Sequence, residues 1–109
     1  LPVAWTTAKF HKENPRVYGA FVKAFGEAIA TINADKGKAA QRYLDIAKDK
    51  RSTHAEILAM LNDPAIEFTM TPKGVMRYVE FMHKIGAIKV KPERWQDLFF
   101  PNAHDLKGS

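Results

Sequence analysis

Cysteine is absent from the chain, and this absence excludes several classes of site. Disulfide frameworks, cysteine-based zinc sites, iron–sulfur clusters and thiol nucleophiles all require it. No apolar run approaches the roughly 18 consecutive residues that a membrane-spanning helix needs. Glycine-rich phosphate loops and the Gly-x-Ser-x-Gly elbow of hydrolases are missing as well. Cysteine usage does not fix a compartment, because exported and cytosolic proteins can both lack it.

The remaining composition describes one ordinary domain at most. The chain has 109 residues, of which 46% are hydrophobic, and a net charge of +5. A chain of this size buries about two-thirds of the surface that its unfolded form exposes, which suffices for a core. The first residues contain neither an initiator methionine nor a cleavable apolar segment. We therefore expect a piece of a longer protein.

The positive charge is spread out and does not form a stripe. Asp45 and Asp49 interrupt the densest basic cluster, and they are better explained by ion pairing with Lys48 and Lys50 than by acid–base chemistry. We favour a solvated basic face, with a basic helical nucleic-acid-binding domain as an alternative. The cluster consists of Lys36, Lys38, Arg42, Lys48, Lys50 and Arg51.

Capping residues and apolar periodicity predict the helices of the first third. A short helix with a threonine N-cap is expected to end at Asn14. Asn14 and Pro15 then predict a long helix over residues 15–34, whose apolar residues recur at steps of three and four. Gly19 and Gly26 each cost this helix up to about 1 kcal/mol relative to alanine, so we expect a neighbouring backbone to approach there.

Two further helices are predicted before residue 64. Asp35 is the expected N-cap of one, which ends in the polar run 48–51. Thr53 and Glu56 have the spacing of a capping box for the other. The expected apolar stripes are Ala39, Ala40, Tyr43, Leu44 and Ala47 on the first, and Ile57, Leu58 and Leu61 on the second.

The period changes after the fourth predicted helix. Apolar Ile66, Phe68 and Met70 alternate with polar residues, which predicts a short extended segment with one buried side. Thr71 and Pro72 then predict a fifth helix, with Gly86 as its left-handed C-cap. Its expected apolar face is Val75, Tyr78, Val79, Met82 and Ile85.

The last twenty residues carry weaker signals. Residues 93–98 predict a short amphipathic turn with Trp95, Leu98 and Phe99 pointing inward. The tail 101–109 has no period and is expected to lie extended over the surface. The predicted fold is therefore mainly α, with about five helices and one short extended segment, and residues 1–109 form a single segment without an internal boundary.

Candidate functional residues are few. His11, His54, His83 and His104 show no metal-ligand spacing, so we expect surface or capping roles for them. We predict no catalytic residue, no metal site and no cofactor.

Trp5, Thr6 and Thr7 form the candidate ligand-binding site. Most aromatic residues fall on the predicted apolar helix faces and are assigned to the core, but Trp5 does not. It lies beside Thr6 and Thr7 at a helix start, where backbone N–H groups and hydroxyls can receive an anion and an indole can wall a pocket. The same three residues are also consistent with purely structural roles, namely capping the helix and filling the core.

Four stretches, in this order, resemble one family of proteins. They are VAWTTAKF and ENP at residues 3–10 and 13–15, AIATINAD at 28–35, FTMTPKGV at 68–75, and WQDLFFP at 95–101. Together they resemble the C-terminal part of the solute-binding proteins of the nitrate, sulfonate, taurine and bicarbonate class, which serve bacterial ABC importers. Gly37 and Lys38 depart from this resemblance, because the family is expected to have proline or acidic residues at the start of the helix that follows Asp35.

The resemblance implies a much longer, two-lobed α/β receptor of the type II periplasmic class. Such a receptor lies outside the cytoplasm, closes on a small solute and delivers it to a membrane permease. The upstream region, with the sheets and most ligand contacts, is not in this sequence, so the solute is not readable. We expect no enzymatic activity, and we expect self-association through apolar helix faces, mainly those of residues 15–34 and 72–85.

A different class shares the same fold within this resemblance. Pyrimidine-synthesising enzymes of thiamine biosynthesis are similar to these receptors, but they need a histidine and other catalytic groups in the cleft. None of the four histidines matches such a context, so we favour transport.

Overall fold

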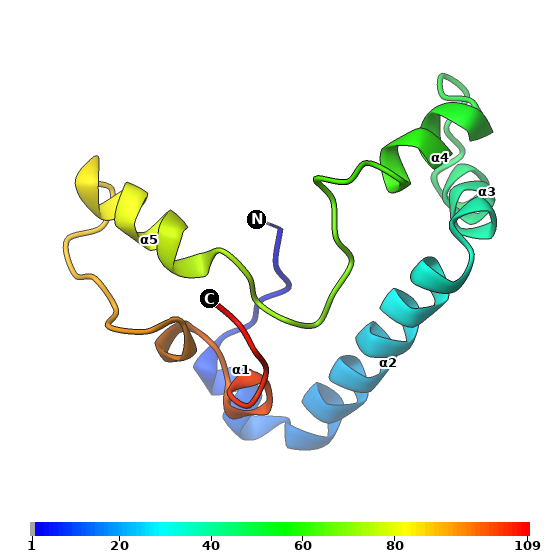
Figure 1. The fold of residues 1–109 in the computed structure, drawn as a ribbon. Helices are drawn as coiled ribbons and strands as arrows, with labels where there is room; N and C mark the ends of the chain where they lie inside the picture. Colours follow the sequence, from blue (N-terminus) through cyan, green and yellow to red (C-terminus); the bar gives the residue numbers. More distant parts are fainter. Residues whose placement is uncertain (1) are drawn as a thin grey trace. The chain divides into compact units, whose positions relative to one another are not determined.

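A computed structural model describes residues 2–109 of the chain as a helical structure (Figure 1). It contains five α-helices, two short 3-10 helices and, among these residues, no strand. The prediction of a mainly α chain is confirmed. Contacts group the residues into two compact units, where the sequence led us to expect no internal boundary. We term Thr6–Thr69 the helical unit, and Met70–Ser109 with residues 2–5 the C-terminal unit.

The first two helices begin where their caps predict. Helix α1 (Ala8–Glu13) starts after Thr7, whose hydroxyl accepts a hydrogen bond of 3.0 Å from the Phe10 N–H. Helix α2 (Pro15–Ala34) has proline in its first turn, as expected. The Asn14 side chain does not cap α2, because its amide donates to the Phe10 carbonyl oxygen at 3.2 Å.

The next two helices also begin at the predicted caps. Helix α3 (Lys36–Ala47) follows Asp35, whose carboxylate accepts from the Lys38 N–H at 3.0 Å. Helix α4 (His54–Leu61) begins with the complete capping box: the Glu56 N–H donates to the Thr53 hydroxyl at 3.2 Å, and the Thr53 N–H donates to the Glu56 carboxylate at 3.1 Å. Each start is therefore determined by side chains within three residues.

Helix α3 packs against α4 and also contacts α2. Ala40 is completely buried, and Ile57 is nearly so. No residue of α2 is buried, although its sequence is amphipathic. The expectation of a close backbone approach is wrong at Gly19, where an added Cβ would meet nothing within 4 Å.

In the segment between α4 and the next helix, the predicted buried side is wrong. Residues 66–70 form no strand, and Ile66 is 46% exposed. Alternation buries one side only where a second layer covers it, and among the described residues no strand pairs with this segment. Instead, the Phe68 carbonyl oxygen accepts a hydrogen bond from the Asn33 side chain in α2.

The C-terminal unit has its own small core. Val75 and Val79 of helix α5 (Val75–Lys84) pack with Trp95 and Ala103. The partly buried side chains around this core are Met76, Ile88 and Phe99.

The two ends of α5 differ in how well the sequence predicts them. Gly86 is confirmed as the left-handed C-cap, with φ of 77°. Its N–H donates to the His83 carbonyl oxygen at 3.0 Å and the Ala87 N–H donates to that of Met82 at 2.9 Å, which is the Schellman pattern. The predicted start at Pro72 is wrong, because the helix begins at Val75 after Gly74 in the left-handed region, with φ of 72°.

The prediction that the tail 101–109 is extended over the surface is wrong, because the 3-10 helix η2 (Pro101–Ala103) folds it back and Ala103 is buried. The helical turn predicted over residues 93–98 is present as the 3-10 helix η1 (Trp95–Leu98). The Ser109 N–H donates to the Pro72 carbonyl oxygen at 3.0 Å. Trp95 points inward as expected and Phe99 packs against this core, but the predicted inward orientation of Leu98 is wrong, since it is 54% exposed.

Candidate functional site

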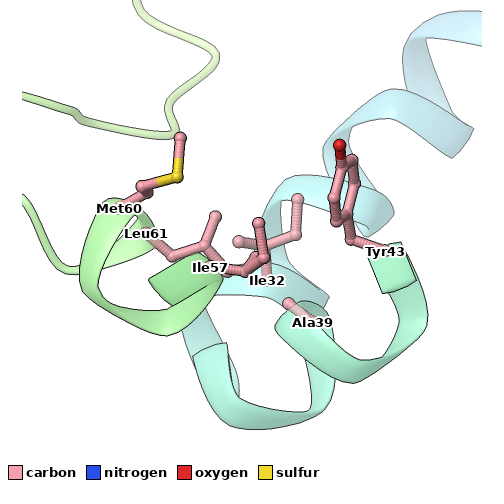
Figure 2. Close-up of a pocket in the computed structure, with 6 residues that line it drawn as sticks. All are labelled: Ile32, Ala39, Tyr43, Ile57, Met60 and Leu61. Carbon is pink, nitrogen blue, oxygen red and sulfur yellow. The ribbon is translucent and has the colours of Figure 1, made fainter. Parts of the chain in front are cut away.

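An open apolar groove of about 350 Å³ lies within the helical unit (Figure 2). Figure 2 shows Met60 of α4 and Tyr43 of α3 at its two ends, with Ile32 and Ile57 between them. Tyr43 and Met60 are half-exposed or more, whereas Ile57 is buried. The full lining is Ile32, Ala39, Tyr43, Ile57, Met60 and Leu61.

The groove exists because three helices bring their apolar stripes to one place. The small side chains at Ala39 and Ala40 let α3 approach its neighbours closely. Met60 was not among the residues predicted for the α4 stripe, although its position three residues after Ile57 places both on one helix face. The helical spacing was therefore a signal for Met60. Ile32 lies on the apolar stripe predicted for residues 15–34, but the sequence did not show that this stripe meets those of α3 and α4.

The surroundings of the groove are polar on one side. An adjoining hollow of about 580 Å³ shares Ile32, Ala39 and Tyr43 with the groove and is bordered by Asp35 and by the cations Lys38 and Arg42. No buried side-chain nitrogen or oxygen of residues 2–109 lacks a hydrogen-bond partner. The groove therefore offers mainly apolar contact area, and the hydroxyl of Tyr43 is the polar side-chain group of its lining.

The predicted ligand-binding residues Trp5, Thr6 and Thr7 lie elsewhere. Trp5 is 84% exposed, so it does not plug a core. Thr6 is half-buried, and the Thr7 hydroxyl caps α1. Thr6 and Thr7 belong to the helical unit and do not line its groove, whereas Trp5 groups with the C-terminal unit. The prediction that these three residues contact a solute stays a prediction.

The four histidines have different surroundings. The imidazole Nε2 atoms of His54 and His104 lie 2.8 and 2.7 Å from the carbonyl oxygens of Gly37 and Phe99. His11 packs edge-to-face on Tyr18, with ring centroids 4.5 Å apart, and His83 lies exposed in the last turn of α5. Among the residues that the structure describes, no three histidine, aspartate or glutamate side chains gather in a way that could hold a metal ion.

Two carboxyl groups, those of Asp97 and Asp49, have a lowered pKa. The Arg94 side chain donates to Asp97 at 3.1 Å and lowers the pKa of that carboxyl. The backbone N–H groups of Arg51 and Ser52, at 2.8 and 3.1 Å, lower the pKa of Asp49. Both arrangements stabilise a local turn, since the donors lie within three residues of each carboxylate.

The ion pairs expected for Asp45 and Asp49 with neighbouring lysines are not among those of the described residues. Asp45 instead accepts from the Gln41 amide at 2.9 Å. A pair between Lys91 and Glu80, with 3.1 Å between nitrogen and oxygen, links α5 to the segment that follows it.

Comparison of the chain with protein-family models, curated proteins and solved structures finds no match. None of the helices in the described part of the chain has the length and apolar character needed to cross a bilayer.

Proposed function

We propose that this chain is the C-terminal part of a solute-binding protein of an ABC importer, with a small solute and a membrane permease as its partners. The proposal rests on the resemblance of its four sequence stretches to the nitrate, sulfonate, taurine and bicarbonate class. It places the whole protein outside the cytoplasm. The parent is a two-lobed α/β receptor that closes non-covalently around its solute.

The structural observation that carries the proposal is the uncovered apolar face of α2. This helix has 20 residues and none of them is buried. Val17, Phe21 and Phe25 remain 57%, 51% and 39% exposed, and the two phenylalanine rings stack with centroids 5.6 Å apart. Full burial of such a side chain contributes about 1.5–3 kcal/mol, so an apolar stripe left uncovered favours a helix that packs against another part of a larger protein.

A similar face on α5 supports the same interpretation. Tyr78, Phe81 and Ile85 are each more than half exposed, although Val75 and Val79 of the same helix are buried. Helices that cover the sheets of an α/β receptor need apolar residues on the side that meets the sheet.

We propose a binding role and no enzymatic role. The imidazoles of His54 and His104 lie within hydrogen-bond distance of backbone carbonyl oxygens, and His11 packs edge-to-face on Tyr18. Enzymes of the thiamine-pyrimidine type need a histidine in the cleft, and none of the four histidines lines the apolar groove of the helical unit.

The test begins with the complete coding sequence in which this chain occurs. The proposal expects an upstream α/β region and neighbouring genes for a permease and an ATPase. The purified complete protein should gain thermal stability with one of nitrate, taurine, an alkanesulfonate or bicarbonate, because a ligand bound only to the folded state raises the melting temperature. A gene that encodes only this stretch would contradict the proposal. Covalent loss of a histidine during turnover would instead favour the pyrimidine-synthesising enzyme of thiamine biosynthesis.

A further inference from the structure

The tail of the chain closes the start of α5. The Val75 N–H donates to the Ser109 carbonyl oxygen at 2.7 Å, and the Gly74 N–H donates to the Ser109 hydroxyl at 3.0 Å. The Ser109 N–H returns a hydrogen bond of 3.0 Å to the Pro72 carbonyl oxygen. Ser109 therefore satisfies two of the N–H groups that a helix start leaves without an internal partner. In Figure 1, the red end of the chain accordingly returns toward the beginning of α5.

Gly108 is the residue that lets the tail come this close. A Cβ atom on Gly108 would lie 2.6 Å from the Pro72 carbonyl oxygen and 2.7 and 2.8 Å from the indole atoms Cε2 and Cζ2 of Trp95. These distances are far below van der Waals contact, and the obstacles are a backbone carbonyl and a ring that is only 6% exposed. Any side chain at position 108 therefore forces the tail away from Trp95.

The segment that carries these contacts is otherwise loosely held. Asp105, Leu106 and Lys107 are exposed, and Gly108 itself is half-buried. By contrast, Val75, Val79 and Trp95 belong to the buried core of the unit. Segments with few buried contacts open at a lower free energy than the core beside them.

We propose that Gly108 and Ser109 form a latch, which covers one face of Trp95 and sets the first residue of α5, and which opens locally while α5 stays folded. This inference goes beyond the proposed transport function and does not depend on it. The open latch exposes the Trp95 ring and frees the N–H groups of Gly74 and Val75. The closed latch stabilises the helix start at Val75 in place of Pro72.

The fluorescence of Trp95 tests the latch directly. The chain has two tryptophans, so a Trp5→Phe background leaves Trp95 as the single reporter. In that background Gly108→Val should shift Trp95 emission to longer wavelength and raise its acrylamide quenching toward that of the exposed Trp5, measured in a Trp95→Phe protein. The helical circular dichroism at 222 nm should not change. Gly19→Ala is the matched control, because a Cβ at Gly19 meets open space.

A second variant and amide exchange in the unmodified protein test the latch independently. Ser109→Ala removes only the hydroxyl contact with Gly74, so it should raise the quenching less than Gly108→Val does. In the unmodified protein, the Gly74 and Val75 amides should exchange with deuterium faster than the Val79 amide in the middle of α5.

Unchanged quenching in the Gly108→Val protein would overturn the latch. Loss of the helical signal together with the shift in emission would also overturn it, since opening would then require unfolding. Equal exchange rates at Gly74, Val75 and Val79 would have the same meaning.

Discussion

The side-chain amide of Asn33 donates a hydrogen bond to the carbonyl oxygen of Phe68, at 2.9 Å and across 35 residues of sequence. Asn33 lies in the last turn of α2, and Phe68 lies in the segment that follows α4. This hydrogen bond therefore joins the last turn of α2 to the end of the helical unit.

Asn33→Asp should lower the free energy of unfolding by about 1–2 kcal/mol. A carboxylate has no proton to donate to the Phe68 carbonyl oxygen, and a negative charge is unfavourable in the last turn of a helix. Urea unfolding followed at 222 nm measures the change. Asn62→Asp at the C-cap of α4 is the control. Within the part of the chain that the structure describes, the Asn62 side chain donates no hydrogen bond that the replacement would remove. Equal losses in the two variants would mean that the Phe68 contact contributes nothing.

The pKa of Asp97 should lie below the ordinary aspartate value of about 3.9 and should rise in Arg94→Ala. The hydrogen bond from the Arg94 side chain stabilises the ionised carboxylate of Asp97. The backbone N–H of Arg94, which donates to the same carboxylate at 3.3 Å, is still present in the variant, so the rise in pKa should be partial. A depressed folded-state pKa contributes stability above the unfolded value, and this stability is lost as the pH falls through the folded value. Carboxyl chemical shifts followed against pH measure the change. Arg77→Ala, which removes the same charge from an exposed position, should leave the pKa of Asp97 unaltered.

The two tryptophans should differ sharply in their effect on stability. Trp5 is 84% exposed and Trp95 is 6% exposed. Trp95→Ala should cost about 3–5 kcal/mol, as expected when a large core side chain is removed, whereas Trp5→Ala should change the free energy of unfolding by no more than about 0.5 kcal/mol. Denaturant titration of both variants provides the comparison.

If the chain belongs to the receptor proposed above, Trp5→Ala should also weaken solute binding by that complete protein, and this readout is separate from stability. Titration calorimetry with the solute found by the thermal screen measures it. Unchanged affinity would remove Trp5 from the candidate ligand-binding site.

The chain should self-associate through the exposed face of α2. Sedimentation velocity at several concentrations should show a sedimentation coefficient that rises with concentration. Phe21→Asp should weaken association about tenfold or more, since burying one phenylalanine contributes about 1.5–3 kcal/mol and about 1.4 kcal/mol is a factor of ten.

Val90→Asp is the control for this association. Val90 is 85% exposed and lies outside the apolar faces of α2 and α5, so its replacement should leave the sedimentation behaviour unchanged. A monomer at every concentration would contradict the prediction.

The candidate site could be predicted only in small part. Tyr43, Ile57 and Leu61 were expected on apolar helix stripes, but stripes assigned helix by helix do not show which of them meet. Trp5, Thr6 and Thr7 were singled out by their chemistry alone, and none of them lines the groove.

The sequence by itself determined where most helices begin and end. Thr7, Asp35, Thr53 and Gly86 act within a few residues along the chain, so their hydrogen bonds are complete in any context that forms the helix. Only the tertiary structure decided the start of α5, the inward fold of the tail and the lack of a strand over residues 66–70. The first N–H groups of α5 donate to Ser109, which lies 35 residues from Gly74 in sequence. A partner that distant leaves no local pattern, because it becomes a neighbour only after the unit has folded.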